Sequence, residues 1–550
     1  MPELDPSEAA PRALYNRAPD VFRRGGWTPM RMYSDDEPVD FAIVGTGAGG
    51  GTLACKLAEY GFSVVALDAG PYWRPLEDFA SDEREQTKLY WTDERLVDGD
   101  NPLALGANNS GKSVGGSTVH FAMVSLRFRP ERLKARTKLG YGVDWPIDWR
   151  EMWRYYREVE ETLKISGPIS YPWGPERPRY PYRPHELNAA ALVLAEGAEK
   201  LGIKWTPTPI ATLSAPRGEA HPCVYRGMCV IGCSTNAKQS VLVTWLPRAL
   251  AAGAEIRDLA MVGRIEHNER GLATGVSYFR QGEWRFQRAK NVVVAGYAIE
   301  TPRLLLNSAS GRFPDGLANS SGLVGKNLMV QANQAVWGLM DREIRSYKAP
   351  PSLALTEHWN YAEEGKDFHG GYCYMSQGPL PTAWAKTVSA SKGLWGQRLI
   401  DEMENYNHQA GLKIVGEVMP QERNSVTLAD ERDQYGLRIP RVTFSYCDND
   451  KRLIRHSLDF MRKALEAAGA TDIWDETDDT AHLGGTARMG DDPDASVVSA
   501  DCRSWDIPNL WVCDGSVMPT VGGVNPSLTI QALACRTADR IKEMASHGEL

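Results

Sequence analysis

The chain has 550 residues, 42% of them apolar and 24% charged, and a formal net charge of −8. This composition predicts an ordinary globular protein with room for several hydrophobic cores. Acidic and basic residues are interspersed, which excludes the basic stripe that nucleic-acid binding needs. No apolar run approaches the length of about 18 residues that spans a bilayer. The first residues also lack the apolar core of a secretory signal.

The N-terminal part predicts an arm followed by one βαβ unit. Residues 1–37 are rich in proline and charge, so we expect little regular structure there. The run "DFAIVG" from Asp40 predicts a short buried strand, and "TLACKLAEYG" has the apolar spacing of a helix that Gly61 would end. A second strand, "SVVALDAG", reaches Asp68.

A glycine-rich turn joins the first strand to the helix, with the spacing Gly45-x-Gly47-x-x-Gly50. The first glycine permits the tight bend, the second lets the backbone approach a pyrophosphate, and the third allows close packing of helix on strand. The helix N-terminus would face the phosphates with free N–H groups, and Asp68 would accept from ribose hydroxyls. This order of elements predicts a dinucleotide site, but it does not choose between FAD and NAD.

Further elements follow at wide intervals. Residues 147–165 predict an amphipathic helix, and the proline-rich stretch 166–184 predicts a long surface connection. "QRAKNVVVAGY" at 287–297 predicts a buried strand, and "TPRLLLNSA" at 301–309 predicts the start of a helix with proline near its first turn. Residues 330–470 mix strand-like and loop-like stretches, and "NLWVCDGS" and "NPSLTIQALACRTADRIKEMA" predict a last strand and a terminal helix.

Several segments together resemble the glucose–methanol–choline (GMC) oxidoreductase family. They are "GKSVGGSTVHFAMVSLRFRP" at 111–130, "AGYAIETPRLLLNSA" at 295–309, "HLGGTARMG" at 482–490 and "LWVCDGSVMPTVGGVNPSLTIQALA" at 510–534. The resemblance runs from about residue 38 to the C-terminus, and family members bind FAD and oxidise alcohols. It implies an α/β fold with a Rossmann-like FAD-binding domain (38–140, 190–330 and 475–550) and an inserted substrate-binding domain on a mixed sheet (141–189 and 331–474).

The resemblance implies that His482 is the catalytic base and Asn525 its polar partner. Removal of a hydroxyl proton needs a base whose pKa lies near the working pH, which suits histidine. An asparagine can hydrogen-bond the same substrate oxygen without competing for the proton. Asn525 also precedes Pro526 and an apolar-periodic helix, so a helix-capping role is an alternative, and the two roles are compatible.

His120 stands where some family members carry a histidine covalently linked to the flavin. The alternative is a histidine that packs near the isoalloxazine without a bond, and the motif does not decide between them. The further FAD contacts that the resemblance implies are Gly45, Gly47, Gly50, Asp68, Gly115, Gly116, Ser117, Ala122, Met123, Val262, Asp514, Gly515, Asn525 and Pro526.

Three of the nine cysteines fall within residues 223–233: Cys223, Cys229 and Cys233. Their spacing is not that of a zinc ribbon, which needs paired C-x2-C knuckles and a fourth ligand. It is similar to the trio in the branch of the family that contains the catalytic subunits of gluconate, fructose and sorbitol dehydrogenases and bacterial FAD-dependent glucose dehydrogenase. This similarity implies a three-iron (3Fe-4S) cluster as the electron exit. That branch usually follows its last cysteine with proline, whereas this chain has Ser234. Buried free thiols, or one disulfide and a spare thiol, remain alternatives.

We therefore expect an FAD-dependent dehydrogenase that oxidises a hydroxyl of a sugar, sugar acid, polyol or glycoside. The implied partners are a small export or chaperone subunit and a cytochrome or other electron acceptor, with no nucleic acid and no transmembrane segment. The location would be periplasmic by co-export if the branch resemblance holds, and otherwise cytoplasmic. One rival function is a dioxygen-using oxidase of aryl or aliphatic alcohols; a more remote one is a non-catalytic flavin-binding protein.

Overall fold

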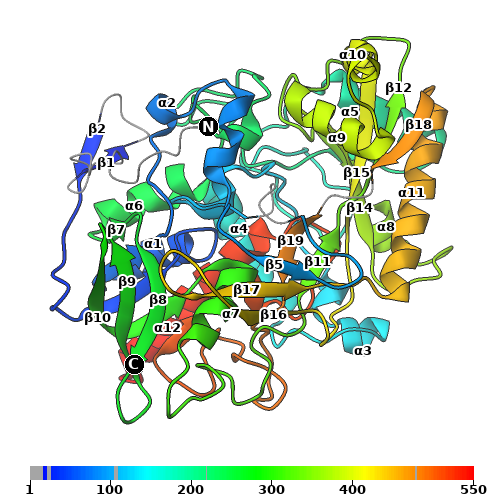
Figure 1. Ribbon diagram of the computed structural model, residues 1–550. Coiled ribbons are helices and arrows are strands. Elements are labelled where there is room, and N and C mark those ends of the chain that lie inside the picture. The colour runs from blue at the N-terminus through cyan, green and yellow to red at the C-terminus, as the bar shows by residue number, and fades with distance from the viewer. Residues whose placement is uncertain (1–16, 21–25, 105–109, 219, 477–479) are drawn as a thin grey trace.

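The computed structural model describes residues 17–20, 26–104, 110–218, 220–476 and 480–550 (Figure 1). The predicted βαβ unit is confirmed: β3 (Val39–Val44), α1 (Gly50–Glu59) and β4 (Val64–Leu67) follow one another. The strands are almost wholly buried, as their unbroken apolar runs require in a parallel sheet. Gly61 adopts φ +92° just beyond the helix, a conformation that favours glycine.

The first large sheet has a parallel half and an antiparallel half. The parallel order is β7 (Glu255–Arg257), β4, β3, β10 (Glu283–Val294) and β20 (Leu510–Val512). The first half of β10 pairs antiparallel with β9 (Ala273–Arg280), which pairs in turn with β8 (Met261–His267). In Figure 1 this sheet occupies the lower left of the molecule.

Helices from distant parts of the chain pack together beside the parallel half. α12 (Ser527–His547) packs against both α1 and α4 (Trp149–Leu163), and α6 (Trp245–Ala251) packs against α1. α4 confirms the helix predicted at 147–165, and the Asp148 carboxylate caps it by accepting from the Arg150 N–H at 2.7 Å.

The helix predicted to start near Thr301 begins four residues earlier. α7 spans Tyr297–Asn307, so Pro302 lies inside it and not in its first turn. A proline there cannot donate to the carbonyl four residues before it, which belongs to Ala298. The Thr486 hydroxyl donates to that carbonyl at 2.8 Å instead, so a residue distant in sequence allows the helix to extend through the proline.

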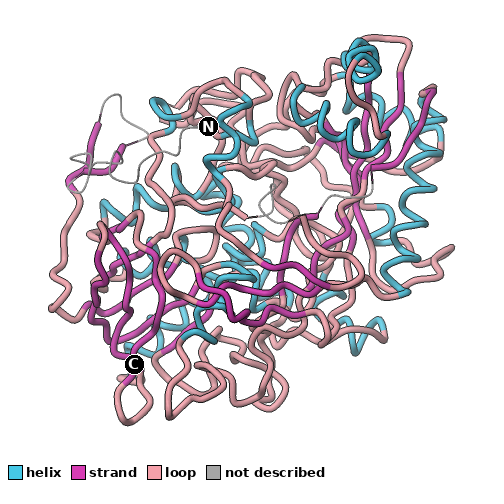
Figure 2. The backbone as a smooth tube through the Cα atoms, viewed as in Figure 1, coloured by secondary structure: helices cyan, strands magenta, loops and turns pink. Residues whose placement is uncertain are grey.

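The second large sheet is antiparallel throughout its described pairs. Its order is β18 (Thr471–Glu476), β12 (Ala335–Leu339), β15 (Gln409–Gly416), β14 (Tyr372–Gln377), β13 (Ala354–Thr356) and β6 (Thr206–Pro207). Strands β12, β14, β15 and β18 lie at the upper right in Figure 1. β11 (Met329–Ala332) pairs with β15 and with β19 (Thr480–Gly484). Figure 2, in the same view, shows strands at the upper right of the molecule, away from those of the first sheet at the lower left.

Two elements within the predicted FAD-binding segment 190–330 lie with this second sheet. β6 is its edge strand, and α5 (Ala189–Lys200) packs against α11 (Asp448–Ala468) and β14. The α5–α11 approach is close because Gly197 has no side chain; a Cβ there would lie 2.3 Å from the Ala464 carbonyl oxygen. This packing depends on a partner more than 250 residues away, so local sequence does not reveal it.

The remaining α-helices and strands lie outside these two sheets and the helices described so far. They are β1 (Arg17–Asp20), β2 (Gly26–Pro29), α2 (Pro75–Asp78), β5 (Leu96–Asp98), α3 (Ala135–Leu139), α8 (His358–Tyr361), α9 (Pro381–Lys392), α10 (Gln397–Glu404), β16 (Ser425–Arg432) and β17 (Arg438–Thr443). β1 and β2 form an antiparallel pair inside the arm, where the sequence predicted little regular structure. The stretch 166–184 has no helix or named strand, as predicted. In the described part of the chain, no helix is both long and apolar enough to cross a bilayer.

Candidate active site

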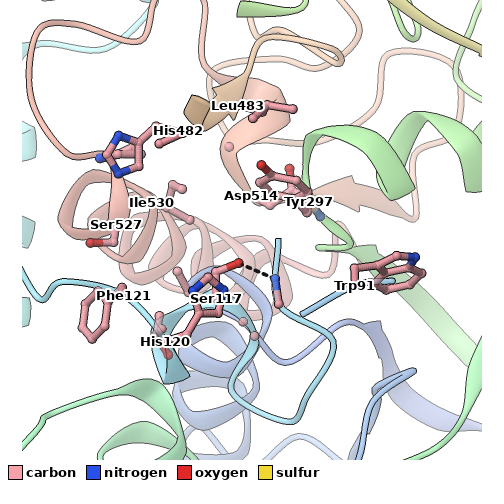
Figure 3. A pocket seen from close by; sticks show the side chains of 18 of the residues that line it. Trp91, Ser117, His120, Phe121, Tyr297, His482, Leu483, Asp514, Ser527 and Ile530 are labelled. Atoms are coloured by element: carbon pink, nitrogen blue, oxygen red, sulfur yellow. Dashed lines mark hydrogen bonds between the residues drawn. The ribbon is translucent and has the colours of Figure 1, made fainter. Parts of the chain in front are cut away.

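A cavity of about 450 Å³ lies between the two large sheets. The glycine turn after β3, the segment 116–124 and the start of α12 line one part of it, and strands β12, β14 and β15 line another. Fourteen residues that the sequence analysis named line this cavity: Gly45, Gly47, Asp68, Gly116, Ser117, His120, Ala122, Met123, Val262, His482, Asp514, Gly515, Asn525 and Pro526. Gly50 and Gly115 stand behind the lining, and Figure 3 shows part of this wall.

The three glycines of the turn have different surroundings. Gly45 has φ +91°, and a Cβ there would lie 2.3 Å from the Ala295 carbonyl oxygen. A Cβ on Gly50 would lie 2.0 Å from the Gly45 carbonyl oxygen. A Cβ on Gly47 would come no nearer to another residue than 3.7 Å, the distance to the Gly116 Cα. Two glycines are therefore required by protein packing, whereas Gly47 leaves space on the cavity side.

The segment around Ser117 is held against this turn. Gly116 touches it directly, since a Cβ on Gly116 would lie 2.7 Å from the Gly47 Cα. The Gly115 N–H donates to the Thr46 hydroxyl at 3.0 Å, and the Gly111 N–H donates to the Ser117 hydroxyl at 2.9 Å (Figure 3). Positive φ angles of 93° and 56° at Gly115 and Gly116 allow this tight path.

Asp68 is buried at the end of β4. Its carboxylate accepts from the Thr46 N–H at 3.0 Å, the Thr46 hydroxyl at 2.6 Å and the Gly70 N–H at 3.0 Å. Burial raises the pKa of Asp68 to about 6, although these hydrogen bonds lower it. An ionised carboxylate offers about four acceptor sites, so one remains for a hydroxyl in the cavity.

Asp514 ties β20 to two helical segments. Its carboxylate accepts from the Tyr297 N–H at 2.8 Å, the Thr301 hydroxyl at 2.6 Å and the Ser516 N–H at 2.7 Å. The residue therefore fixes the start of α7 and the turn that begins at Gly515, both of which border the cavity. These three hydrogen bonds explain structurally why an acid is needed at the end of the last strand.

His120 is buried in the cavity wall, edge-on to the Tyr90 ring with 4.9 Å between ring centroids. Neither ring nitrogen has a hydrogen-bond partner among the residues that the structure describes. Burial, followed by the nearby charge of Lys238, lowers the pKa of His120 to about 3. The imidazole is therefore neutral over the working pH range, and its nitrogens are available to a group in the cavity.

His482 occupies an irregular position in the β11–β19 pair. Val330 pairs with Leu483 and Gln331 with Ala481, so His482 is the extra residue of a β-bulge. Its φ of +59° lies in the left-handed region, which histidine adopts more readily than most residues. Bulges commonly redirect a side chain near active sites. Here the histidine lines the cavity, and Figure 3 shows it across that space from His120 and Phe121.

Asn525 lies beside His482, with its Nδ2 3.4 Å from the imidazole Nε2. An amide NH2 can only donate, so Nε2 presents a lone pair in this pair, which is the form a base requires. The capping alternative for Asn525 is wrong: α12 starts at Ser527 with Pro526 as its N-cap, and no side chain caps the helix. The Oδ1 of Asn525 has no hydrogen-bond partner within the described ranges.

The three cysteines of residues 223–233 border the cavity through their loop. Gly227 and Val230 line the cavity, while Val224 is 57% exposed on the other side. Burial, with a smaller contribution from the other two thiols, raises the pKa of Cys229 to about 12, although the charge of Lys238 opposes this. All three are free thiols, so the disulfide alternative is wrong. No three His, Cys, Asp or Glu side chains in the described part of the chain converge as a metal-ion site.

Sequence reasoning missed Lys238, which connects the cysteine loop to the cavity wall. Its buried ammonium donates to the Val119 and Cys229 carbonyl oxygens, both at 2.7 Å. The residue stands only five positions after Cys233, but a lysine among polar neighbours carries no signal of burial. The sequence analysis also assigned no residue of the lining on and beside the second large sheet: Asn333, Trp337, Gln377, Lys413 and Glu476. The only sequence signal for the members of this set that lie in strands was the alternation of side chains, in which every second residue of a strand lies on the same face.

The cavity fits FAD on three observations. Space for a pyrophosphate lies beside Gly47, unpartnered polar atoms of His120 and Asn525 face the cavity region, and α12 begins at the wall. A helix N-terminus favours negative charge, which suits phosphates or a reduced flavin ring. A dinucleotide turn joined to a cavity that also holds a candidate base defines a dinucleotide-dependent oxidoreductase.

Comparison with known proteins agrees with this class. Sequence models of GMC oxidoreductase match residues 47–333 and 420–534. The chain is 32% identical over 543 residues to 2-methyl-1,2-propanediol dehydrogenase of Mycolicibacterium austroafricanum, covering 94% of this chain and 97% of that protein. It is 30% identical to paromamine 6'-oxidase of Streptomyces fradiae (94% and 93% covered) and 29% identical to the fructose dehydrogenase large subunit of Gluconobacter japonicus (94% and 100% covered).

Among solved structures, pyridoxine 4-oxidase from Mesorbium loti superposes with a TM-score of 0.62 at 17% identity, covering 91% of this chain and 98% of that one. A formate oxidase of Aspergillus oryzae RIB40 gives 0.66 at 16% identity, covering 94% and 100%. These likenesses concern the fold. Together with the sequence matches, they show that the chain belongs to the GMC oxidoreductase family. It is an FAD-binding oxidoreductase that acts on CH–OH groups of alcohol or sugar-like substrates.

Proposed function

We propose that the protein is an FAD-dependent dehydrogenase that oxidises one hydroxyl of a sugar, sugar acid, polyol or glycoside to the carbonyl. The observation that carries the proposal is the pair His482 and Asn525, 3.4 Å apart at the wall of the cavity where α12 begins. Bound FAD supplies the acceptor for the carbinol hydride at its N5. His482 Nε2 takes the hydroxyl proton, and the Asn525 amide hydrogen-bonds the same oxygen and holds it in place.

The substrate-side wall supports a hydroxylated substrate. Asn333, Gln377, Thr387 and Glu476 bring hydrogen-bonding groups to one part of the lining, and Trp337 adds an aromatic face. The Trp337 indole N–H donates to the Glu476 carboxylate at 2.8 Å, which fixes both side chains relative to each other. A few fixed polar groups among apolar ones are typical of a cavity that orients a small polar molecule. Relatives named for 2-methyl-1,2-propanediol, paromamine and fructose agree with this class.

For electron exit, we propose an iron–sulfur cluster held by Cys223, Cys229 and Cys233. The support is their spacing and the position of their loop between the cavity and the surface. A cluster is larger than a single ion, so its ligands need not converge on one point; thiolates are its usual ligands, and it supplies one-electron transfer. The alternative acceptor is dioxygen, which relatives named as oxidases favour.

The proposed partners are an electron-accepting protein and a companion subunit, because one relative is named a large subunit and another a flavoprotein of a dehydrogenase. Periplasmic location by co-export with that subunit belongs to the same proposal.

The test of the chemistry is His482→Asn beside His482→Ala, followed by anaerobic reduction of bound FAD with a panel of sugars and polyols. Asparagine tolerates the left-handed backbone, so the first variant removes the base with the least disturbance of the bulge. Both variants should keep FAD and slow flavin reduction by roughly 10²–10⁴-fold, the range of general-base catalysis. A normal rate of flavin reduction in either variant would remove His482 from the mechanism. If no alcohol bleached the flavin of the wild type, the protein would instead be a non-catalytic flavin-binding protein.

The test of the electron exit is iron analysis of anaerobically purified protein, together with oxygen consumption during turnover. Stoichiometric iron and slow oxygen uptake support the cluster. Iron near zero would reject it, and fast oxygen uptake would make the protein an oxidase.

A further inference from the structure

The loop that carries Asn525 is attached to β11, α8 and β14 by hydrogen bonds to its peptide carbonyls. The side-chain amide of Gln331 donates from Nε2 to the carbonyl oxygens of Val521 (2.9 Å), Gly522 (2.7 Å) and Val524 (3.0 Å). The remaining carbonyl, that of Gly523, accepts from the Asn360 amide at 2.9 Å and the Cys373 N–H at 3.2 Å. Every carbonyl from 521 to 524 is therefore bonded to a residue outside the loop.

Gln331 has no alternative orientation that serves this loop. Three carbonyl oxygens surround one end of its amide, and only the NH2 group can donate to them. The side chain is completely buried, so water does not compete for these bonds. It is also absent from the cavity lining, so it has no direct contact with a molecule there.

The backbone of Gln331 is attached to the other half of the candidate pair. In the β11–β19 ladder Gln331 pairs with Ala481, and the bulge that releases His482 lies between this pair and Val330–Leu483. One residue therefore holds the strand of His482 through its main chain and the loop of Asn525 through its side chain.

We propose that Gln331 is the positioning residue that sets the separation of His482 and Asn525. The inference rests on the proposed function, in which this pair meets the substrate hydroxyl. Without the amide, the carbonyls of Val521, Gly522 and Val524 lose their donor, and the loop shifts to find other partners. Asn525 then moves relative to a histidine that the bulge still fixes.

The chain provides a matched control for loss of a buried glutamine. Gln287 in β10 is also completely buried, and its Nε2 donates to the Glu37 (3.2 Å) and Arg288 (2.8 Å) carbonyl oxygens. It lies in the antiparallel half of the first sheet and does not line the cavity. Gln287→Met removes the same chemistry at the same burial, away from the active site.

The experiment compares Gln331→Met with Gln287→Met as FAD-loaded enzymes. The measurements are FAD content, melting temperature, KM, and the limiting rate of anaerobic flavin reduction by the substrate that best reduces the wild type. We expect Gln331→Met to keep FAD and to lower the limiting rate on the order of 10²-fold, because misplacement by about 1 Å costs that much. Gln287→Met should lose thermal stability and keep its limiting rate within about twofold of the wild type, as expected of sites away from the chemistry.

A wild-type limiting rate in Gln331→Met would overturn the inference, as would an equal loss of rate in Gln287→Met. If Gln331→Met does not accumulate as folded protein, Gln331→Glu decides in the same way. The glutamate side chain has the shape of glutamine and, when protonated, donates one hydrogen bond in place of the two N–H donors of the amide. The limiting rate of flavin reduction in Gln331→Glu should therefore fall between those of the wild type and His482→Asn. Failure of the proposed function is separate, because it would appear as normal flavin reduction in His482→Asn.

Discussion

Replacing Gly47 by valine separates cofactor binding from folding. A Cβ at Gly47 meets nothing closer than 3.7 Å, so the added methyl groups extend into the space beside the glycine turn and leave the protein packing intact. If that space takes the pyrophosphate of FAD, the variant folds and loses the cofactor. Gly50→Val is the contrast, because its Cβ would lie 2.0 Å from the Gly45 carbonyl oxygen and the helix would have to move.

The size of the effect follows from linkage. FAD present at 1,000 times its dissociation constant stabilises the wild-type fold by about 4.1 kcal/mol, and Gly47→Val should gain none of it. The assay is thermal unfolding with and without added FAD, together with the absorbance of the purified protein. Gly47→Val should be colourless, melt near the wild-type apoprotein and show no shift with FAD, whereas Gly50→Val should melt well below both. A yellow Gly47→Val, or one that FAD still stabilises, would refute the assignment of this turn.

Three further outcomes can be measured directly. Asn525→Ala should slow flavin reduction less than His482→Asn and leave the melting temperature nearly unchanged, since Asn525 does not cap α12; a loss of stability without a loss of rate would contradict its catalytic role. Acid precipitation should leave flavin with the protein if His120, neutral with its pKa near 3, is bonded to FAD, and release it if the histidine only packs nearby. Burial raises the pKa of Glu357 from its usual 4.5 to about 7, so the folded state binds the extra proton and stability falls as pH rises from about 4.5 to 7. Glu357→Gln should flatten that part of the stability profile, and an unchanged slope would show that another group causes it.

Local sequence predicted those parts of the site in which neighbours along the chain act together. Gly45, Gly47 and Gly50 lie between one strand and the helix that follows it, so their position at a tight turn could be predicted from spacing. The carbonyl oxygen that crowds Gly45 belongs to Ala295, which local sequence does not reveal. The geometry at His482 could not be predicted from local sequence, because its β-bulge arises from pairing with β11, some 150 residues earlier. The same holds for Lys238, whose burial depends on Val119 and Cys229 carbonyls that its own neighbours do not reveal.

The start of α7 also depends on a residue that is distant in sequence. Proline near residue 301 correctly indicated a helix, but its first residue was misplaced because Thr486 compensates for the missing N–H of Pro302. The capping role considered for Asn525 failed for a related reason. A residue before proline satisfies the sequence pattern for a cap, yet its side chain is directed to His482, a partner that only the fold supplies.

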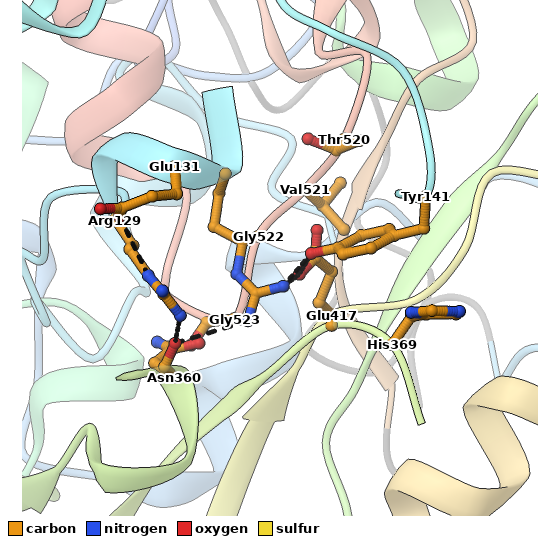
Figure 4. A network of polar contacts seen from close by, with 12 residues as sticks. Arg129, Glu131, Tyr141, Asn360, His369, Glu417, Thr520, Val521, Gly522 and Gly523 are labelled. Atoms are coloured by element: carbon orange, nitrogen blue, oxygen red, sulfur yellow. Dashed lines mark hydrogen bonds and ion pairs between the residues drawn. The ribbon is translucent and has the colours of Figure 1, made fainter. Parts of the chain in front are cut away.

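A second buried network also supports the loop 521–524, through Asn360 (Figure 4). The Arg132 guanidinium lies 3.3 Å from the Glu417 carboxylate, and both side chains are almost fully buried. The Tyr141 hydroxyl contacts both groups, donating to Glu417 at 3.0 Å. Arg132 also donates to the Asn360 carbonyl oxygen at 3.4 Å, and the Asn360 amide reaches Gly523. Removing one partner of such a pair leaves an uncompensated buried charge. Substitutions in this network would therefore destabilise the contacts that support the loop.

The position of β20 has a consequence for how the protein is made. The strand that completes the parallel half of the first sheet beside β10 begins at Leu510, although β10 ends at Val294. At synthesis rates of about 5–20 residues per second, the edge of β10 that pairs with β20 stays unpaired for roughly 10–40 s. Asp514, Asn525 and the start of α12 follow that strand and are synthesised after it. The glycine turn after β3 is thus made more than 450 residues before these residues, which complete the wall of the cavity.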